Sequence, residues 1–155
     1  MLKLWGEKMS KQEITVIDAE NSIAGRLASI VAKRLLEGER IIIVNAEKAV
    51  ISGNRKSVIN EFKSMLEIKT LRNPKRGPKR SRRPDKILKD IVWGMLPKHN
   101  YRGRSAFKRL KVYIGFPDEF KKFKVEKIAE ADISRLKGKY VYLGDVAKEI
   151  GWRGL

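Results

Sequence analysis

Ile14-Thr15-Val16-Ile17-Asp18 and Arg40-Ile41-Ile42-Ile43-Val44 are short runs rich in β-branched residues, and both predict strands. After Arg40 the second run is wholly apolar, which is typical of a strand covered on both faces. Between the runs, apolar residues recur at helical spacing up to Gly38, a residue suited to end a helix. Strand, helix and strand in this order predict a right-handed βαβ unit and a parallel sheet.

The rest of the chain continues as one α/β domain, without an internal repeat or a boundary between two cores. Asn21 or Ser22 is expected to cap the first helix through its side-chain oxygen. Residues 116–138 show no clear pattern. Further helices are expected after 52–54, from 84 to about 96, over 102–110 and over 145–150, and further strands over 111–114 and 140–143. We interpret residues 14–155 as the domain and residues 1–13 as an N-terminal extension, with Met9 as a second possible start of translation.

Residues 69–83 read K-T-L-R-N-P-K-R-G-P-K-R-S-R-R and are the most unusual segment of the chain. Eight of these fifteen residues are Lys or Arg, and none is acidic. Burying so many charges without partners would cost their hydration, and Pro74, Gly77 and Pro78 oppose a continuous helix. We therefore expect an exposed, irregular basic arm that binds a polyanion. Arginine matches the phosphate oxygens of nucleic acid well.

The charge distribution agrees with this interpretation. The chain of 155 residues has a formal net charge of +18. Residues 69–111 contain 16 bases against Asp85 and Asp90, so that +14 lies in this region and the remainder is nearly neutral. One strongly basic region on a nearly neutral body is the electrostatic signature of a nucleic-acid-binding protein. A merely soluble basic surface is the weaker alternative.

No catalytic or metal site is expected. The chain has no cysteine, which excludes disulfides and favours an intracellular, cytoplasmic protein. His99 is the one histidine, and its sequence neighbours offer no partners for catalysis or metal binding. The turn 18–25 could present helix N–H groups to a phosphate, but a capped core helix is the favoured interpretation. No phosphate-binding glycine motif, signal-peptide core or membrane-spanning run is present, so we expect no cofactor, membrane or small-molecule substrate.

Aromatic residues inside the basic region have two possible roles. Tyr101 lies in a basic loop and is the best candidate for stacking on an RNA base. Trp93 and Phe107 are expected to anchor their helices in the core instead.

Five motifs, in order, resemble a known family. They are Gly25-Arg26-Leu27-Ala28-Ser29, Val44-Asn45-Ala46-Glu47-Lys48-Ala49-Val50-Ile51-Ser52-Gly53, Arg72-Asn73-Pro74-Lys75-Arg76-Gly77-Pro78, Gly94-Met95-Leu96-Pro97 and Arg109-Leu110-Lys111-Val112-Tyr113-Ile114-Gly115. Together they are similar to the L-thirteen family of large-subunit ribosomal proteins, and the third resembles its archaeal and eukaryotic branch. The resemblance implies a three-layer α/β/α domain around a mainly parallel four-stranded sheet. It also implies a structural, non-enzymatic component that binds large-subunit rRNA beside neighbouring ribosomal proteins and supports early assembly.

We expect the rRNA contacts to come from the arm, from the short basic helix and from the loop before it. The candidate residues are Lys69, Arg72, Lys75, Arg76, Lys79, Arg80, Arg82, Arg83, Lys98, Tyr101, Arg102, Arg104, Lys108 and Arg109. Two alternatives stay open from the residues alone. One is a free-standing mRNA-binding regulator. The other is a nucleotide- or RNA-modifying enzyme, which would need a pocket of convergent polar groups at the carboxyl ends of the strands.

Overall fold

The computed structural model describes residues 14–154 and contains the predicted βαβ unit. Its elements are β1 (Ile14–Asp18), α1 (Ala24–Glu37) and β2 (Arg40–Val44). The two strands pair in parallel over their whole length. Gly38 ends α1 in the left-handed conformation, with φ of 109°. That conformation is the one in which glycine closes the last turn at no steric cost.

The expected side-chain cap of α1 is wrong. Ile23 occupies the cap position, and its side chain makes no capping hydrogen bond. Asn21 adopts a left-handed conformation, with φ of 57°, and its side chain accepts a hydrogen bond from the Tyr142 hydroxyl. Ser22 forms an isolated bridge opposite Asp132. Tertiary contacts therefore take both residues away from the helix end.

The main sheet has four parallel strands in the order β4-β2-β1-β5. β4 (Leu110–Val112) lies one residue before its predicted position, and β5 (Val125–Glu126) falls within the stretch that showed no pattern. Two residues are too few for a periodic signal, and β5 depends on its pairing with β1 and on an ion pair. Arg34 on α1 donates two hydrogen bonds of 2.8 Å to the Glu126 carboxylate.

A second, smaller sheet pairs β3 (Val50–Ser52) with β6 (Tyr140–Tyr142) in antiparallel fashion. The strand β3 was not predicted, because its three residues follow the second run with only a short 3-10 turn between them. The remaining helices are α2 (Arg55–Glu67), α3 (Pro84–Met95), α4 (Tyr101–Lys108) and α5 (Leu143–Glu149). All four were expected, with ends that differ by a few residues.

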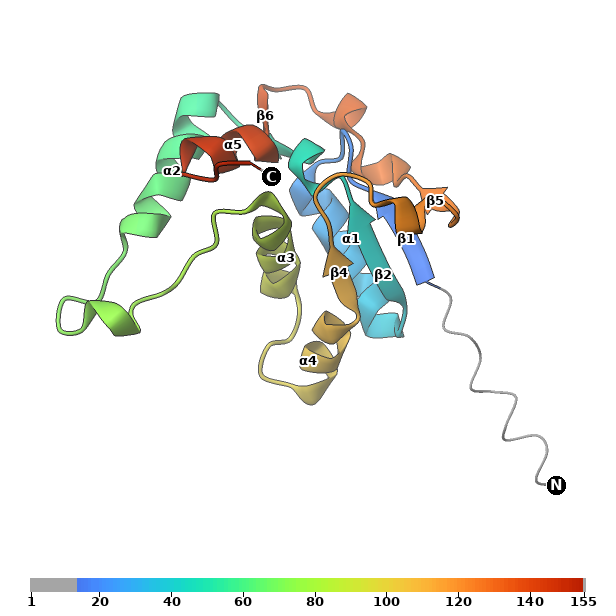
Figure 1. Ribbon diagram of the computed structural model, residues 1–155, viewed down its shortest axis with the longest axis horizontal. Helices are drawn as coiled ribbons and strands as arrows, with labels where there is room; N and C mark the ends of the chain where they lie inside the picture. The colour runs from blue at the N-terminus through green and yellow to red at the C-terminus, as the bar shows by residue number, and fades with distance from the viewer. Residues whose placement is uncertain (1–13, 155) are drawn as a thin grey trace.

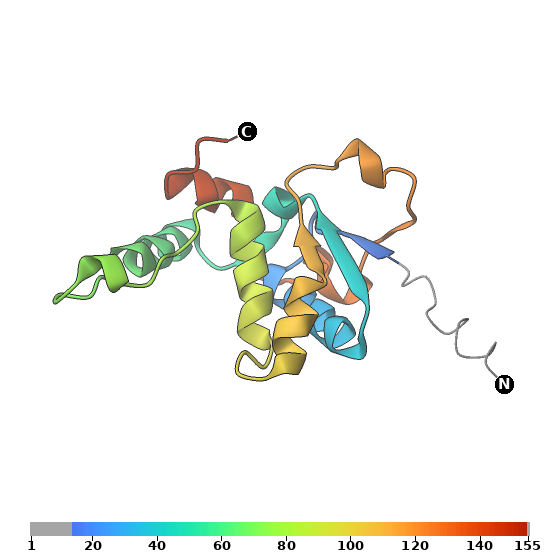
Figure 2. The ribbon, with the colours of Figure 1, turned by 60° about the horizontal axis from the view of Figure 1, so that its bottom comes forward.

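Side chains of the main sheet alternate between its two faces. Ile17, Ile41 and Ile43 pack into a core shared with α1, α3 and α4. Figures 1 and 2 show these helices beside the sheet. On the other face, Val16, Ile42 and Val44 pack against Phe120, together with Tyr113 and Phe116. This second cover contains a short 3-10 helix, Asp118–Phe120. The chain is thus an α/β fold in which helices pack against a parallel sheet, as expected. Residues 1–13, interpreted as an extension, lie outside the described residues.

Candidate nucleic-acid interface

The arm leaves the body at the end of α2 and returns at the start of α3. Figures 1 and 2 both show it projecting beyond the far end of α2. All of residues 69–83 are exposed except Gly77 and Ser81, which are half-buried. Leu71, the one aliphatic residue of the arm, is fully exposed. The expectation that this basic arm is exposed is therefore confirmed.

The tip of the arm has a definite local shape. Asn73 accepts a hydrogen bond from the Lys75 N–H through its side chain, at 3.2 Å, and starts a 3-10 turn over Pro74–Arg76. A Cβ on Gly77 would lie 3.3 Å from the Pro74 carbonyl oxygen, so the turn closes tightly there. Within residues 14–154, no hydrogen bond or ion pair holds the side chains of Lys69, Arg72, Lys75, Arg76 and Lys79. Their charges therefore face solvent, ready for an external anion.

The returning part of the arm, residues 80–83, lies closer to the body. Arg83 donates to both Asp85 carboxylate oxygens, at 3.1 and 3.2 Å, at the start of α3. Arg82 packs beside Gly151 near the carboxyl terminus. Arg80 lies near Asp90. Desolvation raises the pKa of the Asp90 carboxyl, and the positive charges of Arg80 and two lysines of α3 offset only part of that rise. Arg80, Arg82 and Arg83 are exposed, but Arg83 already has an acidic partner.

The other candidates lie at the opposite end of α3. Pro97 lies near the start of the connection from α3 to α4. Gly103 of α4 packs directly on the Pro97 backbone, because a Cβ at Gly103 would be 2.1 Å from the Pro97 oxygen. Lys98, Tyr101, Arg102, Arg104 and Lys108 are all exposed. The arm and α4 are therefore held apart by the length of α3. Twelve residues make a helix of about 18 Å. The structure presents two basic regions rather than one.

Arg109 and Arg102 have internal partners that the sequence did not suggest. The Arg109 guanidinium is half-buried and donates to the Leu35 carbonyl oxygen at 2.6 Å and to Ser105 Oγ at 3.1 Å. Arg102 donates to the Leu36 carbonyl oxygen at 3.3 Å. The last carbonyls of a helix lack partners within the helix, and cations are favourable beside them. Both arginines thus hold α4 against the carboxyl end of α1.

The aromatic residues of the basic region divide between the core and the surface. Trp93 and Phe107 pack on each other with ring centroids 4.6 Å apart and belong to the border of the core. Lys89 lies 4.9 Å above the Phe107 ring. Tyr101, expected in a loop, is instead the first residue of α4; it is 83% exposed, and its stacking on a base stays a prediction.

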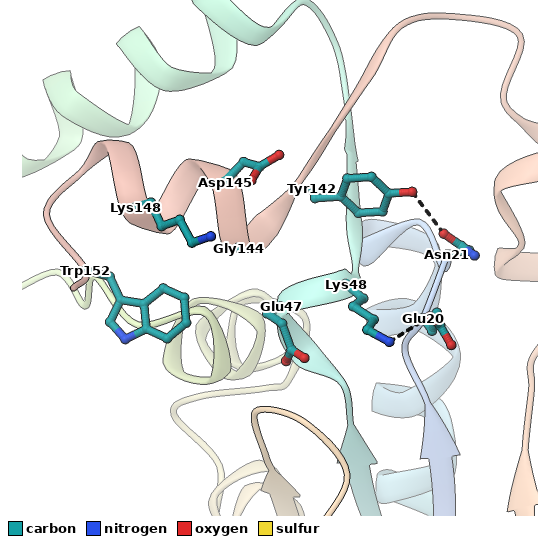
Figure 3. A pocket seen from close by; sticks show the side chains of 9 residues that line it. All are labelled: Glu20, Asn21, Glu47, Lys48, Tyr142, Gly144, Asp145, Lys148 and Trp152. Carbon is teal, nitrogen blue, oxygen red and sulfur yellow. Dashed lines mark hydrogen bonds and ion pairs between the residues drawn. The ribbon is translucent and has the colours of Figure 1, made fainter. Parts of the chain in front are cut away.

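A pocket does lie at the carboxyl ends of β1 and β2, where an enzyme of this fold would have its site (Figure 3). Some of its polar groups pair with one another or with nearby backbone, whereas no hydrogen bond or ion pair among the described residues holds the side chains of Asp145 and Lys148. Glu20 forms an ion pair with Lys48 at 2.8 Å, and Glu47 accepts the Gly115 N–H at 2.9 Å. Among residues 14–154 there is no cluster of His, Cys, Asp and Glu that could hold a metal ion. Neither a histidine nor a cysteine lines the pocket, and His99 lies exposed on the loop between α3 and α4 and is not one of the lining residues.

None of the helices in residues 14–154 is long and apolar enough to cross a membrane.

Comparison with known proteins agrees with these observations. The family described as "Ribosomal protein L13" matches residues 12–119. The large ribosomal subunit protein uL13 of Saccharolobus solfataricus is 48% identical over 145 residues, which cover 93% of this chain and 97% of that protein. The proteins of the same name from Methanopyrus kandleri and Methanosarcina barkeri are 48% and 49% identical, over 92% and 89% of this chain and 89% and 98% of theirs. Both the extent and the identity of these matches show that the chain belongs to the ribosomal protein L13 family, whose members are structural ribosomal proteins and not enzymes.

Proposed function

We propose that this protein is built into the large ribosomal subunit, where the arm and α4 neutralise rRNA phosphates and support early assembly. The observation that carries the proposal is the set of arm lysines and arginines that have no acidic partner among residues 14–154. Like charges held this close repel one another, and the repulsion is relieved when counterions or phosphates approach. Neighbouring large-subunit proteins are the remaining partners.

Two separated basic regions suit a role as a spacer. The arm precedes α3 and α4 follows it, so the rigid helix fixes the distance between two sets of phosphate contacts. Two RNA segments that bind these ends would be held at a defined separation. Apart from Tyr101, the candidate residues are Lys and Arg, which suit phosphate contact more than base reading.

The experiment compares two triple variants of equal charge. In the arm variant, Arg72, Arg76 and Lys79 are changed to Ala, and in the control variant Lys33, Lys56 and Lys63 are changed to Ala on exposed helix faces. Both should fold, as circular dichroism would verify. Only the arm variant should be depleted from large subunits when gradient fractions are quantified by mass spectrometry. Normal incorporation of the arm variant would contradict the proposal, and sedimentation of the parent chain with free mRNA would favour a regulator instead.

A further inference from the structure

The second face of the main sheet is covered over only part of its length. Phe120 and its neighbours pack on Val16, Ile42 and Val44, toward the carboxyl ends of the strands. At the amino ends, Ile14 lies opposite Arg40, and 39% of Ile14 remains exposed. Parallel sheets are normally buried on both faces. The open end of this face is therefore expected to be covered by a partner.

Basic side chains surround the open end. A groove of about 460 Å³ lies there, lined by Ile14, Arg40, Ile42, Ser105, Lys108, Arg109 and Lys111. Lys111 on β4 is in register with Ile42 on β2, so its side chain projects from the same face as Ile42. Four of the seven lining residues are basic, and among the described residues none that lines the groove is acidic.

Most of these bases are available to a ligand. Arg40, Lys108 and Lys111 are exposed, and within residues 14–154 no hydrogen bond or ion pair holds their side chains. Arg109 differs, because the Leu35 carbonyl and Ser105 keep its guanidinium in place. It supplies a fixed positive charge at the wall of the groove. Ile14 and Ile42 form an apolar floor, against which the carbon atoms of a ribose can pack.

We propose that this groove holds a phosphodiester backbone of RNA, as a third contact region in which Arg40 and Lys111 act together with Lys108 of α4. The inference rests on the proposed function, since it names more of the surface that meets the same RNA. Charge complementarity favours a polyanion, and continuity with α4 favours RNA over an acidic segment of a neighbouring protein. Sequence patterns alone could not reveal it, because Arg40 and Lys111 each lie within a strand and become neighbours only through the order of the sheet.

The absence of cysteine from the chain makes a direct test possible. Lys111→Cys introduces a single thiol for a short photo-activated cross-linker, and Lys108→Cys is a second probe of the same groove. Leu71→Cys, at the fully exposed arm position, tests the proposed function in parallel. Each labelled chain is reconstituted into large subunits with rRNA and the other subunit proteins. The cysteine-free parent, treated in the same way, gives the background, and circular dichroism checks each fold.

The inference predicts cross-links to rRNA, above the background of the parent, from the Lys111→Cys chain. Cross-links from the Lys108→Cys chain without any from Lys111→Cys would follow from the proposed function of α4 alone and would overturn the inference. Cross-links from both of these groove variants to protein alone would overturn it in favour of a protein partner. Cross-links to rRNA from the Leu71→Cys chain alone would also overturn it, while leaving the proposed function standing. If none of the three variants reaches rRNA in assembled subunits, both the inference and the proposed function fail.

Discussion

Gly103→Ala tests whether α4 is held by a backbone contact that leaves no space for a side chain. A Cβ at this position would lie 2.1 Å from the Pro97 oxygen, 2.7 Å from the Pro97 carbonyl carbon and 3.0 Å from Pro97 Cγ. Non-bonded carbon atoms pack at about 3.5 to 4.0 Å, so the turn between α3 and α4 must open by roughly an ångström. Two of the three atoms belong to the backbone and cannot turn away. We expect a loss of about 1 to 3 kcal/mol in the free energy of unfolding, as for other overpacked sites.

Gly94→Ala is the matched control. Gly94 also lies in a helix, α3, but it is exposed and nothing lies within 4 Å of a Cβ there. Alanine favours the helix over glycine by about 1 kcal/mol, so this variant should gain stability. Urea unfolding of both variants at neutral pH measures the difference. If Gly103→Ala is as stable as the parent while Gly94→Ala gains the expected amount, the close contact with Pro97 is not what positions α4.

Three other predictions concern single side chains. Arg109→Lys keeps the charge but cannot reproduce both donated hydrogen bonds, so unfolding in urea should show a loss of about 1 to 3 kcal/mol, whereas Arg104→Lys on the exposed face should stay within about 0.5 kcal/mol of the parent. The hydrogen bonds from Arg34 hold the pKa of the Glu126 carboxyl below its ordinary value. The stability from this pair is therefore complete above the ordinary glutamate pKa and is lost as the pH falls through the lower folded value. Glu126→Gln should remove that part of the acid dependence, at most about 1 kcal/mol for a partly exposed pair, and an unchanged acid limb in urea titrations would contradict it. His99→Gln should leave assembly of large subunits near normal in gradient fractions, because a structural ribosomal protein has no use for a catalytic base, and a complete loss of function in a variant that still assembles would argue for an active site.

The sequence was sufficient for the parts of the fold that repeat a pattern over many residues. The βαβ unit follows from two apolar runs and one amphipathic helix, and Gly38 ends that helix as expected. The strands β3 and β5 could not be predicted, because three and two residues are too short for any periodicity. β5 is defined by partners far along the chain, namely β1 and the Arg34 guanidinium. Such contacts exist only once the fold has formed.

The candidate interface, too, could be predicted from the sequence only in part. Charge density and turn-forming residues identified the arm, since a segment with these properties cannot enter a core. The same reasoning counted every base of α4 as available, and it could not foresee that Arg109 and Arg102 donate to the end of α1. Once the end of a helix is known, its last carbonyl oxygens can be expected to need hydrogen-bond donors. The sequence does not say which distant arginine supplies them. Contact of the individual candidates with rRNA stays a prediction.

The internal partners of the bases suggest how one surface serves both folding and binding. At the arm tip, no described acidic residue neutralises the charges, so this segment gains little from the fold and has most to gain from RNA. At α4 the balance differs, since Arg109 is held against α1 before any RNA arrives, and a side chain fixed in advance loses less entropy on binding. We therefore expect α4 and the neighbouring groove to bind RNA as a preformed surface. The arm tip is expected to become ordered only after RNA has bound. Amide exchange of the isolated protein should accordingly be slow in α4 and fast in residues 69–79, and protection in the arm should rise strongly only in assembled subunits.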